Sequence, residues 1–113
     1  CEVMNVIGDV KGKDCILFDD MVDTAGSLCN AAKAIVEVGG ARKVYACASH
    51  GVLSGPAIDR LEASNIEELA LLDTIPAHPE AKRARIKYLT VAPMFSDAIE
   101  RTYQEISISK LFR

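Results

Sequence analysis

The architecture of this chain can be inferred from one stretch, Ile16-Leu17-Phe18-Asp19-Asp20-Met21-Val22-Asp23-Thr24-Ala25-Gly26-Ser27. An apolar run leads into paired carboxylates, and small residues then lead into a segment with helical periodicity. This order predicts a strand over residues 14–19, followed by a turn and a helix that begins near Ala25. A strand that ends in a polar turn and a helix is the unit from which α/β proteins are built.

The predicted junction between strand and helix is a candidate anion site. At the start of a helix the amides of Thr24 to Ser27 have no partner within the helix, and they lie at its positive end. Gly26 permits close approach of the backbone, and the hydroxyls in this range can add donors. Asp19 and Asp20, at the predicted tip of the strand, can accept hydrogen bonds from two neighbouring hydroxyls of a pentose. The pattern indicates a site for a sugar phosphate.

Two interpretations of this junction stay open on these residues alone. Carboxylates beside a phosphate would repel it, unless the sugar separates them and a magnesium ion offsets the charge. The alternative is a solvated acidic turn in which Asp23 caps the helix, since Asp and Thr are ordinary capping residues.

The ten residues from Phe18 to Ser27 resemble the phosphoribosyl pyrophosphate motif of the type I phosphoribosyltransferase fold. More narrowly, the chain resembles the ribose-phosphate pyrophosphokinase family nearly end to end. The other matching segments are Val6-Ile7-Gly8-Asp9-Val10-Lys11-Gly12, Tyr45-Ala46-Cys47-Ala48-Ser49-His50-Gly51, Ser54-Gly55-Pro56-Ala57, Asp73-Thr74-Ile75-Pro76, Val91-Ala92-Pro93-Met94-Phe95 and Ser107-Ile108-Ser109-Lys110-Leu111-Phe112. A plain phosphoribosyltransferase would share only the first motif, so the later segments favour the kinase family.

The resemblance implies an enzyme that transfers the β,γ-diphosphate of ATP to the anomeric hydroxyl of ribose 5-phosphate, with Mg2+ as cofactor. By resemblance, Asp19 and Asp20 bind the ribose hydroxyls. The same resemblance implies that the 5-phosphate is bound by Asp23, Thr24, Ala25, Gly26 and Ser27. Ser27 stands where threonine is frequent in the family, and it keeps the hydroxyl.

The resemblance also implies that residues 1–113 are one phosphoribosyltransferase-like domain, the C-terminal part of a longer enzyme. The family's loop with a catalytic lysine and arginine would lie upstream of Cys1, as would the histidine and aspartate associated with magnesium. We therefore expect no catalytic residue and no metal ligand in this chain, and no activity from it alone.

The C-terminal tail carries a second expectation. By resemblance, Ser107 and Ser109 contribute to a regulatory anion site between the subunits of a cytoplasmic homo-oligomer, with phosphate or ADP as effectors. The alternative is a frayed terminus in which Ile108, Leu111 and Phe112 merely cover the core.

Composition is consistent with a single soluble domain. Half of the 113 residues are apolar, and the net charge is −3 without a strong basic cluster, which argues against nucleic acid as a partner. Apolar runs fall short of the roughly 20 residues that span a bilayer. The four cysteines form no C-x-x-C pair, so we expect reduced thiols rather than a metal site.

The rest of the chain alternates between the two periodicities. We expect strands at 2–7, 14–19, 43–48, 67–72 and 86–91, and helices from about Ala25 to the Gly39-Gly40 stop, from Pro56 to about Ala63 and from about Pro93 to Glu105. This order predicts an open, mostly parallel sheet with helices on both faces.

In such a sheet ligands bind beyond the carboxyl ends of the strands. Asp19-Asp20, Ser49-His50-Gly51 and Asp73-Thr74 should therefore gather at one edge. His50 could contact a ligand or a second subunit, although local hydrogen bonds are the commoner role of a loop histidine. His78 is expected to be an ordinary loop residue.

Competing motifs fail on spacing. Three residues separate Gly8 from Gly12, and Asp14 follows the lysine where a Walker loop needs Ser or Thr. Asp20 and Asp23 do not form the Asp-x-Asp pair of an aspartyl phosphatase, and no lysine follows residues 86–91 as a receiver domain would require. Two relatives stay as alternatives: a non-catalytic regulatory subunit of the kinase, and a transferase that consumes phosphoribosyl pyrophosphate.

Overall fold

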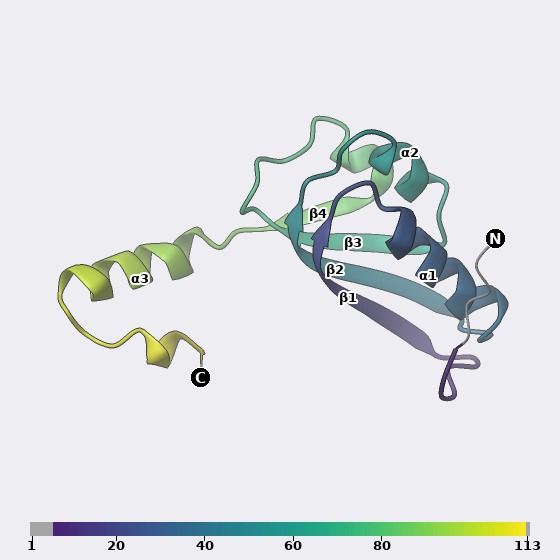
Figure 1. Ribbon diagram of the computed structural model, residues 1–113, viewed down its shortest axis with the longest axis horizontal. Helices are drawn as coiled ribbons and strands as arrows, with labels where there is room; N and C mark the ends of the chain where they lie inside the picture. The colour runs from purple at the N-terminus through teal and green to yellow at the C-terminus, as the bar shows by residue number, and fades with distance from the viewer. Residues whose placement is uncertain (1–5, 113) are drawn as a thin grey trace.

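The computed structural model describes residues 6–112, apart from the side chains of Lys110 and Phe112. Its centre is a parallel sheet of four strands in the order β1-β2-β3-β4 (Figure 1). The strands are β1 (Asp14–Val22), β2 (Lys43–Gly51), β3 (Ile66–Leu72) and β4 (Ile86–Leu89). The predicted open parallel α/β class is confirmed.

Helices follow the strands as the periodicity predicts. They are α1 (Gly26–Glu37), α2 (Ala57–Glu62) and α3 (Ala92–Tyr103), with short 3-10 turns η1 (Ala81–Ala84) and η2 (Ser109–Phe112). Of the strand expected at 2–7, residues 2–5 lie outside the described part of the chain, and Val6 and Ile7 are not in a strand.

The end of α1 shows why the Gly39-Gly40 pair stops the helix. A Cβ at Gly39 would lie 2.7 Å from the Ile35 carbonyl oxygen and 2.6 Å from a methyl of Val10. Gly40 then takes a φ of +75°, a left-handed conformation that glycine adopts at little cost. The chain can therefore turn sharply from α1 into β2.

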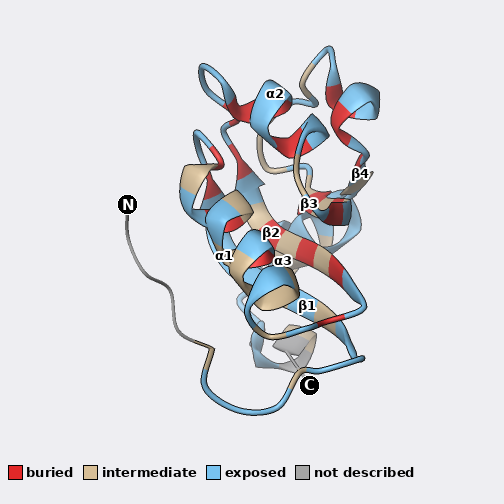
Figure 2. Cartoon of the chain, turned by 90° about the vertical axis from the view of Figure 1, so that its right-hand side faces the viewer, coloured by how far each residue is buried: buried red, intermediate tan, exposed pale blue. Residues whose placement is uncertain are grey.

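One face of the sheet packs against α1 and α2. Along β2, Val44, Ala46 and Ala48 are buried, and Leu69 of β3 lies in register between Ala46 and Ile86 of β4. The helices add Leu28, Ala32, Ala57, Ile58 and Leu61 to the same cluster. Figure 2 shows these buried segments between the sheet and the two helices.

The opposite face differs from the prediction of helices on both faces. Among the described residues no helix packs on it: Phe18 is 80% exposed, and Ile16 and Leu89 are each 58% exposed. Strands that follow one another across a sheet with right-handed crossovers place their helices on the same side. The third helix, α3, has no buried residue and extends away from the sheet (Figure 1).

Two composition-based expectations can be compared with the structure. Cys15, Cys29 and Cys47 are free thiols, as predicted, and Cys1 lies outside the described residues. Within residues 6–112, no helix has the length and apolar character needed to cross a membrane.

Candidate functional site

The loop between β1 and α1 carries the predicted anion site. β1 does not end at residue 19 but stays paired with β2 as far as Val22, opposite Gly51. Asp19 and Asp20 therefore lie inside β1 rather than at its tip, which corrects their predicted place. Both residues are exposed, and Asp19 Oδ1 accepts a hydrogen bond of 2.8 Å from the Asp20 amide.

The first turn of α1 leaves its amides available. The N-cap residue is Ala25, no side chain caps the helix, and its first turn contains no acidic residue. Asp23 does not cap α1, so the alternative of a self-capped acidic turn is not observed. Across residues 6–112, no hydrogen-bond acceptor in the chain receives the N–H groups of Thr24 to Ser27. The junction therefore presents a set of unpartnered donors at the positive end of a helix.

These amides line a small depression. It has a volume of about 200 Å³ and is bounded by Asp19 and residues 21–28. The predicted site residues Asp19, Asp23, Thr24, Ala25, Gly26 and Ser27 all line it, and Asp20 does not. The depression is large enough for a group the size of a phosphate, and Asp19 is among its lining residues.

Ala25 holds an unusual backbone conformation at this point. Its φ of 66° and ψ of 9° place it in the left-handed region, which disfavours residues with a Cβ. Ala25 is also only 5% exposed. Strain of this kind concentrates at functional loops, and neither the strain nor its position is visible in the sequence.

Residues 52–54, which follow β2, hold the start of the loop between β1 and α1 through three backbone hydrogen bonds. Val52 and Leu53 donate to the Val22 carbonyl at 2.9 and 3.1 Å, and Ser54 donates to the Asp23 carbonyl at 2.9 Å. In a trans peptide unit the N–H points opposite to the C=O. Because the Asp23 carbonyl is turned toward Ser54, the Thr24 amide of the same peptide unit is turned away from Ser54.

The carboxyl ends of β1, β2 and β3 gather at one edge, as predicted. Met21 is in register with His50, and His50 forms an isolated bridge with Asp73. His50 Nδ1 lies 2.7 Å from Thr74 Oγ1, and that hydroxyl donates to the Ser49 carbonyl at 3.2 Å. His50 thus makes the local bond expected of it, from the end of β2 rather than from a loop.

Asp73 ties the end of β3 to the start of α3. Its Oδ1 accepts the Val91 amide at 2.8 Å, and its own amide donates to the Leu89 carbonyl. The pKa of Asp73 is lowered, first by this bond from Val91 and next by a bond from Thr90. The carboxylate therefore has a structural role at the base of α3.

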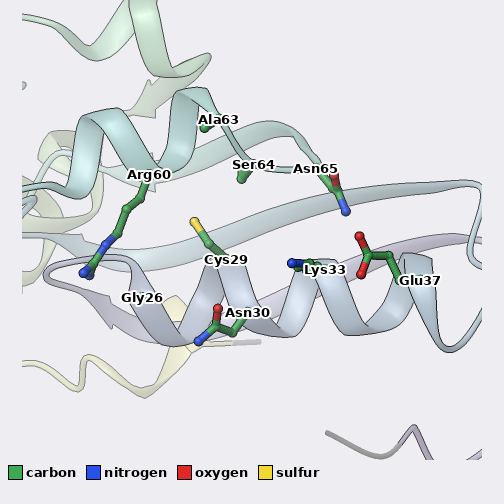
Figure 3. A pocket seen from close by; sticks show the side chains of 9 residues that line it. All are labelled: Gly26, Cys29, Asn30, Lys33, Glu37, Arg60, Ala63, Ser64 and Asn65. Carbon is green, nitrogen blue, oxygen red and sulfur yellow. The ribbon is translucent and has the colours of Figure 1, made fainter. Parts of the chain in front are cut away.

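A second, larger depression lies between α1 and α2 (Figure 3). Its volume is about 500 Å³. The lining residues are Gly26, Cys29, Asn30, Lys33, Glu37, Arg60, Ala63, Ser64 and Asn65. Burial raises the pKa of the Cys29 thiol, partly offset by Ser64 and Arg60, so Cys29 is protonated near neutral pH. Gly26 lines both depressions, which makes them neighbours across the start of α1.

The predicted regulatory serines lie beyond α3. Ser107 Oγ and Ser109 Oγ are 2.8 Å apart, and the Ser109 amide donates to Ser107 Oγ at 3.1 Å. Both are exposed, and Ile108 is 42% exposed and not part of the core. The alternative in which the tail covers the core is therefore not observed for Ile108, and the side chain of Phe112 lies outside the described residues.

The described part of the chain does not form a metal site by itself. No group of three or more His, Cys, Asp or Glu side chains is placed there to hold an ion. Among its contacts, His78 accepts the Glu80 amide at its Nδ1 and donates its own amide to the Tyr88 hydroxyl.

Comparison with known proteins agrees with this arrangement. A family model described as the phosphoribosyl synthetase-associated domain matches residues 2–113. The chain is 55% identical over 112 residues to a ribose-phosphate pyrophosphokinase of Clostridium acetobutylicum and 57% identical over 111 residues to one of Caldanaerobacter subterraneus. These alignments cover 99% and 98% of this chain and 35% of each relative.

A solved structure gives the same result. The crystal structure of phosphoribosylpyrophosphate synthetase from Mycobacterium smegmatis matches with a TM-score of 0.82 and 36% identity, over 88% of this chain and 33% of that one.

The parallel sheet, the loop between β1 and α1, and the relatives together define the class of protein, which is an α/β domain of phosphoribosyl synthetases. The chain belongs to the phosphoribosyl synthetase-associated domain family. Its close relatives are named as an enzyme, ribose-phosphate pyrophosphokinase, and the chain spans about a third of their length.

Proposed function

We propose that this chain is the acceptor-binding part of a ribose-phosphate pyrophosphokinase, and that it forms the C-terminal part of that enzyme. The reaction transfers the diphosphate of ATP to O1 of ribose 5-phosphate, giving phosphoribosyl pyrophosphate and AMP. The observation that carries this proposal is the row of unpartnered amides from Thr24 to Ser27 at an uncapped helix start. The names of the relatives supply the substrate class.

The 5-phosphate would lie against these amides. An anion there gains hydrogen bonds from N–H groups that the protein leaves free, and it lies at the positive end of α1. The hydroxyls of Thr24 and Ser27 can add donors. The unpartnered donors favour a ligand-binding role over a regulatory relative in which the loop has lost its function.

The ribose hydroxyls would meet the carboxylates of β1. Asp19 lines the same depression as the amides, and Asp20 follows it in the strand. Both carboxylates are exposed, so a ligand can reach them without rearrangement of the core. Holding the phosphate at one end and the diol at the other would fix O1 for in-line attack, and positioning of this kind supplies much of the rate in phosphoryl transfer.

The remaining machinery lies outside this chain in our proposal. Adenine recognition, the lysine and arginine that neutralise the transferring phosphate, and the Mg2+ ligands would come from the other two thirds of the enzyme. Mg2+ would supply charge neutralisation between ATP and acceptor. We further propose a cytoplasmic homo-oligomer with phosphate or ADP as effectors at the Ser107–Ser109 tail.

The test is a titration of the full-length enzyme with ribose 5-phosphate by calorimetry. Asp19→Asn should weaken binding about tenfold, because a hydrogen bond to a charged group contributes on the order of 1.5 kcal/mol. Asp14→Asn is the matched control, since Asp14 starts the same strand, is exposed and carries the same charge. Equal weakening by both variants, or none by Asp19→Asn, would contradict the assignment of the diol site.

A further inference from the structure

The Arg60 side chain extends from α2 to residues 23–27, the candidate anion site between β1 and α1, which we call the anion loop. It approaches this loop from the side of the larger depression. Its Nη1 donates to the Thr24 carbonyl at 3.2 Å. An ideal Cβ at Gly26 would lie 3.0 Å from the same nitrogen. Figure 3 shows the Arg60 side chain extended from α2 toward Gly26, at the end of the depression between the two helices. The absence of a side chain at residue 26 is what lets the guanidinium come this close.

The charge of Arg60 is not used in an ion pair among the described residues. Its neighbours on α2, Asp59 and Glu62, both pair with Arg83, which also pairs with Glu80. The two acidic neighbours of Arg60 on α2 are thus paired with another arginine, and Arg60 keeps its positive charge beside the loop.

The bond to Thr24 controls the direction of one particular amide. The Thr24 carbonyl and the Ala25 N–H belong to the same trans peptide unit and point in opposite directions. The hydrogen bond draws the Thr24 carbonyl toward Arg60. The Ala25 N–H therefore turns the opposite way, toward the smaller depression that Asp19 and residues 21–28 line. Ser54 orients the preceding peptide unit in the same way through the Asp23 carbonyl. These two bonds fix consecutive peptide units on either side of Thr24.

The same bond also helps to hold Ala25 in its left-handed conformation. A residue with a Cβ leaves this region readily unless its surroundings hold it there. A flip of the unit between Thr24 and Ala25 would turn a carbonyl oxygen toward the bound anion in place of an N–H.

We propose that Arg60 is a positioning residue for the acceptor phosphate: it holds the Thr24 carbonyl inward, so that the Ala25 amide points at the ligand, and it adds positive charge behind the loop. The proposal rests on the function proposed above. Arg60 does not touch the ligand in this scheme, and it acts through the backbone of residues 24–26.

The experiment is steady-state kinetics of the full-length enzyme with Arg60→Met and Arg60→Lys. Arg60→Met should raise KM for ribose 5-phosphate about fivefold to tenfold, as expected for loss of one charge-assisted bond, with kcat and the KM for ATP within about twofold. Arg60→Lys, which keeps the charge and a donor, should recover most of the loss. Arg42→Met is the matched control, because Arg42 lies beside the amino end of the sheet and pairs with Asp14.

Gly26→Ala perturbs the same contact from the other side and leaves residue 60 as arginine. Its Cβ should displace the guanidinium and raise KM for ribose 5-phosphate, and combining it with Arg60→Met should add little further. Such non-additivity is expected only if both changes act through one contact. A thermal melt of each variant shows whether it remains folded.

The outcomes separate this inference from the function on which it rests. If Asp19→Asn and Gly26→Ala raise KM for ribose 5-phosphate and Arg60→Met does not, the role of Arg60 is wrong and the acceptor site stands. If Arg60→Met raises KM for ribose 5-phosphate and KM for ATP equally, the role of Arg60 is also wrong. The same holds if Arg60→Lys does not restore KM for ribose 5-phosphate. If none of these variants changes KM for ribose 5-phosphate, the acceptor site itself is wrong.

Discussion

A single methyl group added at Gly51 should destabilise the sheet next to the anion loop. An ideal Cβ at residue 51 would lie 2.4 Å from Cδ1 of Leu71 and 3.4 Å from its Cγ. Carbon atoms in contact prefer about 3.5–4.0 Å, so one of the two side chains must move by about 1 Å. Leu71 is only 1% exposed and is packed on the helix-covered face of the sheet, which leaves it little room. We expect Gly51→Ala to cost about 2 kcal/mol, within the usual range for overpacking.

The assay is urea denaturation of the full-length enzyme and its variants, read as a change in midpoint at constant slope. Leu71→Ala should cost about 3 kcal/mol through the cavity that it leaves. In the double variant the new methyl occupies part of that cavity, so its cost should fall at least about 1 kcal/mol short of the sum. A destabilisation by Gly51→Ala below about 0.5 kcal/mol, or strictly additive costs, would refute the proposed clash with Leu71.

Three further predictions concern acid stability, regulation and activity. The folded-state pKa of Asp73 lies below 3.8, so the stability it contributes is present above that pH and is lost as the pH falls through its folded pKa. Acid titrations followed by circular dichroism should therefore show a flatter profile for Asp73→Asn, and an unchanged profile would assign the acid transition elsewhere. In the full-length enzyme, the double change Ser107→Ala/Ser109→Ala should weaken activation by phosphate and inhibition by ADP. Unaltered effector curves would show that these two serines do not form the regulatory anion site. Residues 1–113 alone should release no measurable AMP from ATP with ribose 5-phosphate and Mg2+, because loss of even one oriented donor lowers kcat by roughly 10²- to 10³-fold. Turnover within tenfold of the full-length enzyme would disprove the proposal that the catalytic groups lie outside this chain.

The first helix of the fold could be predicted because the signals for its start and its end are local in the sequence. The helical spacing of the apolar residues after Gly26 and the Gly39-Gly40 stop are properties of neighbouring residues, and both are found in the structure. The end of β1 was predicted too early, because pairing with β2 extends the strand past residue 19 to Val22 and through Asp20, whose residue type has low strand propensity. Tertiary pairing of this kind is not encoded in the strand itself.

The candidate site was only partly predictable for a similar reason. Glycine at residue 26 and the hydroxyls beside it are readable signals of a phosphate loop, whereas the left-handed conformation of Ala25 gives no signal in its residue type. The contact between Arg60 and Thr24 joins residues far apart in the sequence, and no local pattern marks it. One-sided helix packing followed from the order of the strands, which periodicity does not reveal.

The strand order has a consequence for how the chain acquires its structure during synthesis. Each strand lies beside the one made just before it: Ala46 pairs with Leu17, Leu69 with Ala46, and Ile86 with Leu69. None of these four strands has to insert between two that have already paired. As the ribosome releases the chain, each new strand meets a finished edge and each crossover closes only a short loop, which keeps the entropic cost of every step low. The sheet can therefore grow in the direction of translation, and the anion loop is enclosed as soon as β2 and the segment after it emerge.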